Sequence, residues 1–140
     1  MYHIALIEEE VAIREYLRWV LENAGYRVHP FAAAWQFLKE SSTATFDLVI
    51  MNMALPDVNG SVLAWLLRKN PSTADIPILA TTVFDSREYS KYSQAGADEI
   101  PLDGILHLPV APDKLVDTVK YCLIHRPENN RNPRSNSQSA

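Results

Sequence analysis

Glu8, Asn52 and Thr82 each stand where an apolar run of the chain ends, and side chains of these types could share one small reactive site. A carboxylate at position 52 could attack phosphorus and carry an acyl phosphate. A carboxamide is neutral and nearly non-nucleophilic. The residue type at position 52 therefore decides between a chemical switch and a protein that signals by its shape.

Five short apolar runs could position these side chains. Because the runs show little polar alternation, they indicate strands that are buried on both faces of a mostly parallel sheet. The predicted strands are Tyr2–Ile7, Tyr26–Phe31, Leu48–Met51, Ile76–Thr82 and Ile105–Leu108. Ligand sites in such sheets lie at the carboxyl ends of the strands. We therefore expect Glu8, Asn52, Thr82 and Leu108 to lie near one another.

Segments with helical periodicity separate the runs and make five βα units. The predicted helices are residues 11–24, 32–41, 60–70, 86–96 and 112–125. After position 126 the composition changes to arginine, asparagine, proline and serine. We expect one domain over residues 1–126 and a disordered tail or linker over residues 127–140.

The composition is that of a globular protein of 140 residues, 47% hydrophobic and 21% charged. The single cysteine, Cys122, cannot form a disulfide within the chain, and the four histidines show no metal-ligand spacing. The net charge of -4 argues against binding of nucleic acid. No signal peptide or membrane-spanning run is visible, so we expect a cytoplasmic protein that binds no membrane.

Several local motifs resemble one family jointly. They are Leu6-Ile7-Glu8-Glu9-Glu10, Asp47-Leu48-Val49-Ile50-Met51-Asn52 followed by Leu55-Pro56 and Gly60, Pro77-Ile78-Leu79-Ala80-Thr81-Thr82-Val83, Ala95-Gly96-Ala97-Asp98, and Leu108-Pro109. Over about residues 2–125 the chain resembles the receiver domain of two-component response regulators. The resemblance implies a flavodoxin-like (βα)5 fold with a five-stranded parallel sheet in the order 2-1-3-4-5. It also implies a cis peptide bond before Pro109.

The chain departs from the family pattern where the chemistry would occur. Asn52 replaces the phosphoacceptor aspartate, Leu108 replaces the lysine, and Ile105 stands where an aromatic switch residue is usual. Thr82 matches the switch hydroxyl. The acidic pair is represented by Glu8 and Glu9, each one methylene longer than aspartate, which displaces a carboxylate by roughly 1–1.5 Å. Octahedral Mg²⁺ tolerates little such displacement, so we expect no cofactor and weak or absent Mg²⁺ binding.

These joint losses suggest a pseudo-receiver, meaning a receiver fold without the phosphoacceptor. We expect Glu8 to accept a hydrogen bond from the Asn52 amide, with Thr82 as a second candidate donor. Structural explanations stay open, because Asn52 could be a turn residue, Glu9 could be a first-turn helix residue, and Thr82 could be a plain strand-end hydroxyl. Asp57, in the same loop as Asn52, could serve as a surrogate acceptor.

Without chemistry, function depends on surfaces. Helical periodicity places Trp19 away from the core stripe of its helix, and the same construction exposes Tyr121 and Ile124. Tyr89 and Tyr92 fall on one side of the fourth helix. Together these five residues are candidates for an interface, and the resemblance implies a homodimer through helix four, strand five and helix five. Trp35 and Trp65 also fall off the inner stripes, and we expect them to pack on each other.

Three interpretations follow from these observations. The leading one is a non-enzymatic, phosphorylation-independent receiver module that binds signalling proteins such as a sensor kinase or an output domain. The alternative is a receiver still phosphorylated by a sensor histidine kinase at a non-standard residue. A small flavodoxin-like enzyme or cofactor binder is disfavoured, because no glycine-rich loop follows the first strand.

Overall fold

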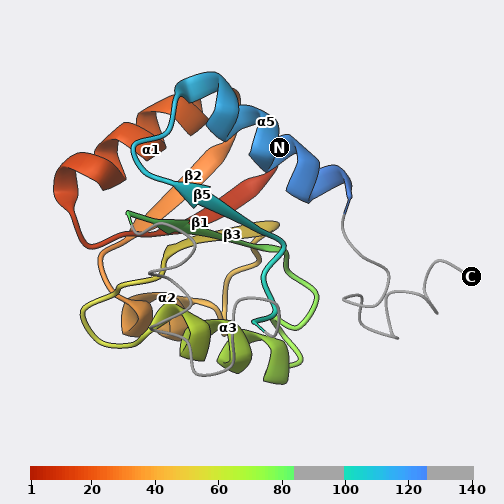
Figure 1. Cartoon of the computed structure of the whole chain (residues 1–140). Coiled ribbons are helices and arrows are strands. Elements are labelled where there is room, and N and C mark those ends of the chain that lie inside the picture. Colours follow the sequence, from red (N-terminus) through yellow and green to blue (C-terminus); the bar gives the residue numbers. More distant parts are fainter. Residues whose placement is uncertain (84–99, 126–140) are drawn as a thin grey trace, which may run out of the picture.

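Five short strands form one parallel sheet in the computed structural model, which describes residues 1–83 and 100–125. The strands are β1 (His3–Ile7), β2 (Arg27–Phe31), β3 (Leu48–Asn52), β4 (Ile78–Thr82) and β5 (Gly104–His107). Their order across the sheet is β2-β1-β3-β4-β5 (Figure 1). The predicted α/β flavodoxin-like fold and strand order are therefore confirmed.

Helices cover both faces of this sheet in the described part of the chain. They are α1 (Val11–Asn23), α2 (Ala34–Glu40), α3 (Gly60–Lys69) and α5 (Pro112–Ile124). Figure 1 shows α1 and α5 over one face and α2 and α3 over the other. The helix predicted at 86–96 and the tail predicted at 127–140 lie outside the described residues. No helix within 1–83 or 100–125 is long and apolar enough to span a bilayer.

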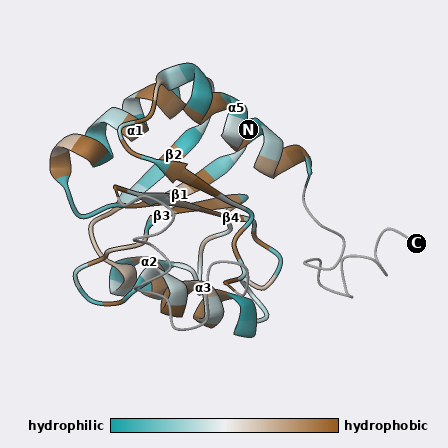
Figure 2. Cartoon of the chain, in the orientation of Figure 1, coloured by the Kyte–Doolittle hydropathy of each residue, from teal (hydrophilic) through white to brown (hydrophobic). Residues whose placement is uncertain are grey.

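Alternation along the strands divides the core into two layers. Ile4 and Leu6 of β1 pack toward α1 and α5, whereas Ala5 and Ile7 pack toward α2 and α3. Figure 2 shows that each helix packed on the sheet carries both apolar and polar residues. Burial on both faces explains why the strand sequences show almost no polar alternation. The two layers also fix which face each residue at the strand ends can reach.

The observed elements differ from the predicted ones by one or two residues at most ends, as is usual for such boundaries. The fifth strand begins at Gly104 and ends at His107, one residue earlier than predicted. Its start is held by Asp103, whose carboxylate accepts a hydrogen bond from the Ile78 N–H of the neighbouring strand at 2.7 Å. Leu108, predicted to end the strand, follows it and donates its N–H to the Thr82 carbonyl at 2.8 Å.

Candidate functional site

The carboxyl ends of β1 and β3 bring Glu8 and Asn52 into contact. The amide nitrogen Nδ2 of Asn52 donates a hydrogen bond to Oε1 of Glu8 at 2.7 Å. Glu8 follows β1 directly and is only 2% exposed. The two residues come from adjacent parallel strands whose registered pairs include Ile7 with Met51. The expected hydrogen bond from the Asn52 amide to Glu8 is therefore present.

The remaining acceptors of this pair are also engaged. Oε2 of Glu8 accepts the N–H of Glu10 at 2.9 Å, so each carboxylate oxygen has a donor. Oδ1 of Asn52 accepts the N–H of Ala54 at 2.9 Å. Both ends of the Asn52 amide are thus held, one by a buried carboxylate and one by the loop that follows β3. This arrangement fixes the orientation of the side chain at position 52.

Glu9 and Glu8 have different surroundings. Glu9 is exposed, and within residues 1–83 and 100–125 its carboxylate makes no hydrogen bond or ion pair. The acidic pair implied by the resemblance is therefore a single buried glutamate with an exposed neighbour. Arg14, which sequence reasoning missed, donates from its guanidinium to the backbone carbonyls of Glu8 at 2.7 Å and Glu9 at 3.1 Å. The Arg14 guanidinium therefore holds the backbone of the turn between β1 and α1.

Thr82 is the last residue of β4, and Leu108 directly follows β5. Thr82 closes β4, is 1% exposed and pairs in register with His107 of β5. Donation from Thr82 to Glu8 stays a prediction. Leu108 packs at the edge of the apolar layer under α1 and α5, and the peptide bond to Pro109 is cis, as the resemblance implied. An apolar side chain thus directly follows the carboxyl end of β5.

Asp57 does not lie free in its loop. Its carboxylate oxygens accept the N–H groups of Ala34 at 3.1 Å and Trp35 at 2.9 Å. These are the first two residues of α2, whose own flanking residue provides no side-chain cap. The loop after β3 therefore caps the helix after β2, which gives Asp57 a structural role.

The geometry does not fit a hexacoordinate Mg²⁺ at these strand ends. Both oxygens of Glu8 already accept hydrogen bonds, and Asn52 turns its NH₂ group rather than its oxygen toward Glu8. Among residues 1–83 and 100–125, no group of three acidic, histidine or cysteine side chains could hold a metal ion. Weak or absent Mg²⁺ binding stays a prediction, and these residues offer no ligand set that would oppose it.

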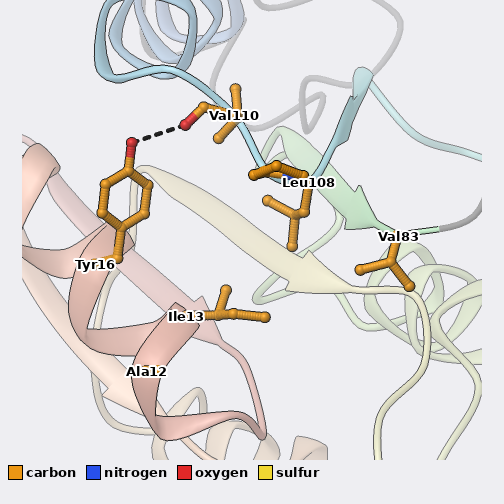
Figure 3. A pocket seen from close by; sticks show the side chains of 7 residues that line it. Ala12, Ile13, Tyr16, Val83, Leu108 and Val110 are labelled. Carbon is orange, nitrogen blue, oxygen red and sulfur yellow. Dashed lines mark hydrogen bonds between the residues drawn. The ribbon is translucent and has the colours of Figure 1, made fainter.

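An apolar pocket of about 310 Å³ lies beside the site. It is lined by Ala12, Ile13, Tyr16, Val83, Leu108, Pro109 and Val110. Figure 3 shows Ile13 of α1 and Leu108 among the side chains that border this hollow. The Tyr16 hydroxyl donates to the Val110 carbonyl at 2.8 Å and ties α1 to the loop before α5. The surroundings of Leu108 are therefore apolar.

Three of the five interface candidates are described, and all three are exposed. Trp19 is 63% exposed, Tyr121 59% and Ile124 72%. The Tyr121 ring stacks on His125 with 4.1 Å between ring centres. Tyr89 and Tyr92 lie outside the described residues.

The expectation that Trp35 and Trp65 pack on each other is wrong. Both are exposed, at 58% and 44%, and no ring contact joins them. Their positions on the neighbouring helices α2 and α3 gave no information on the directions of the two rings. Exposure of a ring does not by itself identify a partner, so the interface stays a prediction.

Comparison with known families decides the classification. The pattern described as the response regulator receiver domain matches residues 4–120 of this chain. The chain belongs to this family. The chain is therefore a receiver domain of two-component signalling.

Curated relatives of the receiver are longer than this chain. It is 33% identical over 101 residues to the KDP operon transcriptional regulatory protein KdpE of Escherichia coli (strain K12), covering 71% of this chain and 43% of KdpE. It is 28% identical over 120 residues to the phosphate regulon transcriptional regulatory protein PhoB of Pseudomonas aeruginosa, covering 86% and 51%. The receiver thus spans about half the length of these relatives.

Solved receiver structures superpose over nearly the whole domain. The chemotaxis response regulator CheY4 of Vibrio cholerae has a TM-score of 0.77 at 25% identity, covering 88% of this chain and 99% of CheY4. A CheY-like receiver domain protein of Methanospirillum hungatei has a TM-score of 0.78 at 25% identity, covering 90% and 96%. The backbone of this chain therefore follows the receiver fold of these structures.

Proposed function

We propose that this chain is a pseudo-receiver that signals without a phosphoryl group at position 52 and acts through protein contacts. The observation that carries the proposal is the hydrogen bond from the Asn52 amide to the buried Glu8 carboxylate. An amide that is neutral and bonded at both ends supports the proposal, because a phosphoacceptor at this position would need a free nucleophilic oxygen.

The chemistry of phosphoryl transfer supports this proposal. Transfer depends on positioning and on positive charge that stabilises the phosphoryl oxygens. Among the described residues, Arg14 is a cation beside the site, and its guanidinium is bonded to the backbone carbonyls of Glu8 and Glu9. Leu108 supplies no charge and borders an apolar pocket. Among residues 1–83 and 100–125 the site thus offers neither a carboxylate at position 52 nor a cation at position 108, and these two charges of opposite sign would cancel.

The same contacts support a receiver that stays in one conformation. In an ordinary receiver a phosphoryl group would bind the switch hydroxyl and change the surface formed by the last helices and strands. Here the Asn52–Glu8 bond and the bond from the Ala54 N–H hold this end of the sheet together. The input of such a module is its own abundance or the binding of a partner. Its partners are signalling proteins, such as a sensor kinase or an output domain.

Intact mass spectrometry after incubation with acetyl phosphate and Mg²⁺ tests the proposal directly. We expect the mass to stay unchanged, whereas a phosphorylated receiver gains about 80 Da. A phosphorylatable receiver domain in the same reaction controls for active reagent. A stable, hydroxylamine-sensitive adduct would overturn the proposal and favour phosphorylation at a non-standard residue.

Such an adduct could be located with the Asp57→Asn variant. The single asparagine oxygen can still accept one of the two N–H groups of α2, so this variant should keep the fold while it loses the carboxylate and one capping bond. If an adduct persists in this variant, the phosphorylated residue is not Asp57.

Titration of the native chain with Mg²⁺ and beryllofluoride, followed by tryptophan fluorescence, should likewise give no saturable response.

A further inference from the structure

A second hollow lies between α1 and α5, on the side of the sheet opposite α2 and α3 (Figure 1). Its volume is about 360 Å³. It is lined by Trp19, Val20, Asn23, Ala24, Pro112, Asp113, Val116 and Asp117. It shares no lining residue with the apolar pocket beside Leu108. We call it the α1–α5 groove.

One wall of the α1–α5 groove is an exposed aromatic ring over an apolar floor. Trp19 is 63% exposed, the largest exposed fraction among the three tryptophans. Val20 beneath it is buried and Val116 opposite it is half-buried. No ring contact with a described residue holds the Trp19 indole, although its backbone carbonyl accepts the Asn23 amide at 2.8 Å. The ring is thus available to a ligand that enters the groove.

The other wall is acidic. Asp113 and Asp117 lie one turn apart on α5, and both are exposed. Asp113 accepts the N–H of Lys114 at 3.0 Å and lies in the first turn, where the helix dipole favours a carboxylate. Asp117 makes no hydrogen bond or ion pair with any residue in 1–83 or 100–125. Lys114 and Lys120 lie three residues before and after Asp117 on α5, but neither forms an ion pair with it among the described residues, so its carboxylate can meet a cation from outside the chain.

We propose that the α1–α5 groove binds a lysine- or arginine-bearing segment of a partner protein. The alkyl part of such a side chain would lie on the apolar floor and against Trp19. Its cationic end would lie between Asp113 and Asp117 and near the indole face, which attracts cations. This inference rests on the proposal that the chain acts through protein contacts, and it adds the surface and the chemistry of the partner.

Charge complementarity favours this occupant over the alternatives. A second copy related by a two-fold axis would bring its own Asp113 and Asp117 toward the same carboxylates, which repels. Nucleic acid would bring phosphates to the same acidic wall. A basic segment is instead attracted by both carboxylates and by the net charge of -4 of the whole chain.

Nuclear magnetic resonance of the ¹⁵N-labelled chain provides a direct test, because each of the three tryptophans gives one indole N–H signal. The signals are assigned with Trp→Phe variants. The probe is a short synthetic amphipathic peptide with leucines at helical spacing and lysines on its polar face. Its control carries glutamine in place of every lysine.

We expect the lysine peptide to shift the Trp19 signal saturably and to leave those of Trp35 and Trp65 nearly unmoved. The glutamine peptide should bind about tenfold more weakly, as should the lysine peptide to the double variant Asp113→Asn, Asp117→Asn. Higher salt should weaken the lysine peptide only. The matched controls Trp35→Ala and Glu40→Gln, both exposed on α2, should bind as the native chain does.

Several results would overturn the inference. They are an unmoved Trp19 signal at excess peptide, equal binding of the two peptides, and unchanged affinity in the double variant. A Trp19 signal that moves with chain concentration alone would assign the groove to a second copy. None of these results changes the mass expected after acetyl phosphate treatment, so failure here is distinguishable from failure of the proposed function.

Discussion

Replacing Asn52 by aspartate tests the hydrogen bond at the centre of the site. Nδ2 of Asn52 lies 2.7 Å from Oε1 of Glu8, which is 2% exposed. The Asn52→Asp variant keeps the size of the side chain but exchanges the donor for a carboxylate oxygen. Two carboxylates at this distance cannot both ionise cheaply, so we expect the pair in the variant to share one proton.

The expected loss of stability follows from that distance. Two full charges 2.7 Å apart repel by about 6 kcal/mol at an effective dielectric constant of about 20. Keeping one carboxyl of the pair protonated costs about 1.4 kcal/mol for each pH unit above the ordinary carboxyl range, or about 4 kcal/mol at pH 7. This cost is smaller than the repulsion between two ionised carboxylates, so the pair with one proton is the more stable state at pH 7.

The sign of the pH dependence follows from the same proton. The folded variant binds one proton more than its unfolded chain, so raising the pH favours unfolding. The loss relative to the native chain should therefore grow by about 2.7 kcal/mol from pH 5 to pH 7.

Urea unfolding followed by circular dichroism at these two pH values measures the loss. The matched control is Asn59→Asp, which changes the net charge equally. Asn59 caps α3 by accepting the N–H of Ser61 at 2.8 Å, and an aspartate oxygen can accept the same bond. A loss that is equal at pH 5 and pH 7, or no larger than that of the control, would show that the Asn52 amide is not the donor to Glu8.

Two further predictions concern the frame around the site. The guanidinium of Arg68 lies 2.9 Å from the Asp103 carboxylate, and the two side chains are only 12% and 9% exposed. Chemical unfolding of the Arg68→Met variant should therefore show a loss of about 3–5 kcal/mol in stability, because the Asp103 charge stays buried without its partner. The control variant Lys69→Met should lose little. Burial, with the nearby charge of Asp103, raises the pKa of the Cys122 thiol from 9.0 to about 11. The contribution of the protonated thiol to the free energy of unfolding is fully present below pH 9 and is lost toward pH 11, because the unfolded chain releases the proton first. Relative to the Cys122→Val variant, the native chain should therefore lose stability as the pH rises from 8 to 11.

The sequence allowed the sheet to be predicted because burial on both faces leaves a direct signal in the strands. β3 reads Leu-Val-Ile-Met before Asn52, and each of these four residues is buried. The start of β5 was less predictable, because a tertiary contact of Asp103 determines it. The Asp103 carboxylate accepts hydrogen bonds from the Ile78 N–H and from the Arg68 guanidinium, and no local sequence pattern predicts either contact.

The site could be predicted in part for the same reason. Along β1, Ile7 faces α2 and α3, so the next residue, Glu8, continues toward the face of Leu6, and Asn52 follows Met51 in the same way. Alternation therefore brings Glu8 and Asn52 to one face. Glu9 could not be assigned from the motif, because the turn before α1 decides its direction.

The residue types at positions 52 and 108 depend on each other physically. An aspartate at position 52 would face the Glu8 carboxylate with no compensating cation, because Leu108 supplies none. A lysine at position 108 would bring an ammonium group beside an apolar pocket while both Glu8 oxygens already have donors. Either ordinary residue alone thus adds a poorly compensated charge, whereas Asn52 and Leu108 together leave every described polar atom of the Glu8–Asn52 pair bonded. This coupling supports the proposal that the receiver acts by binding and not by phosphoryl transfer.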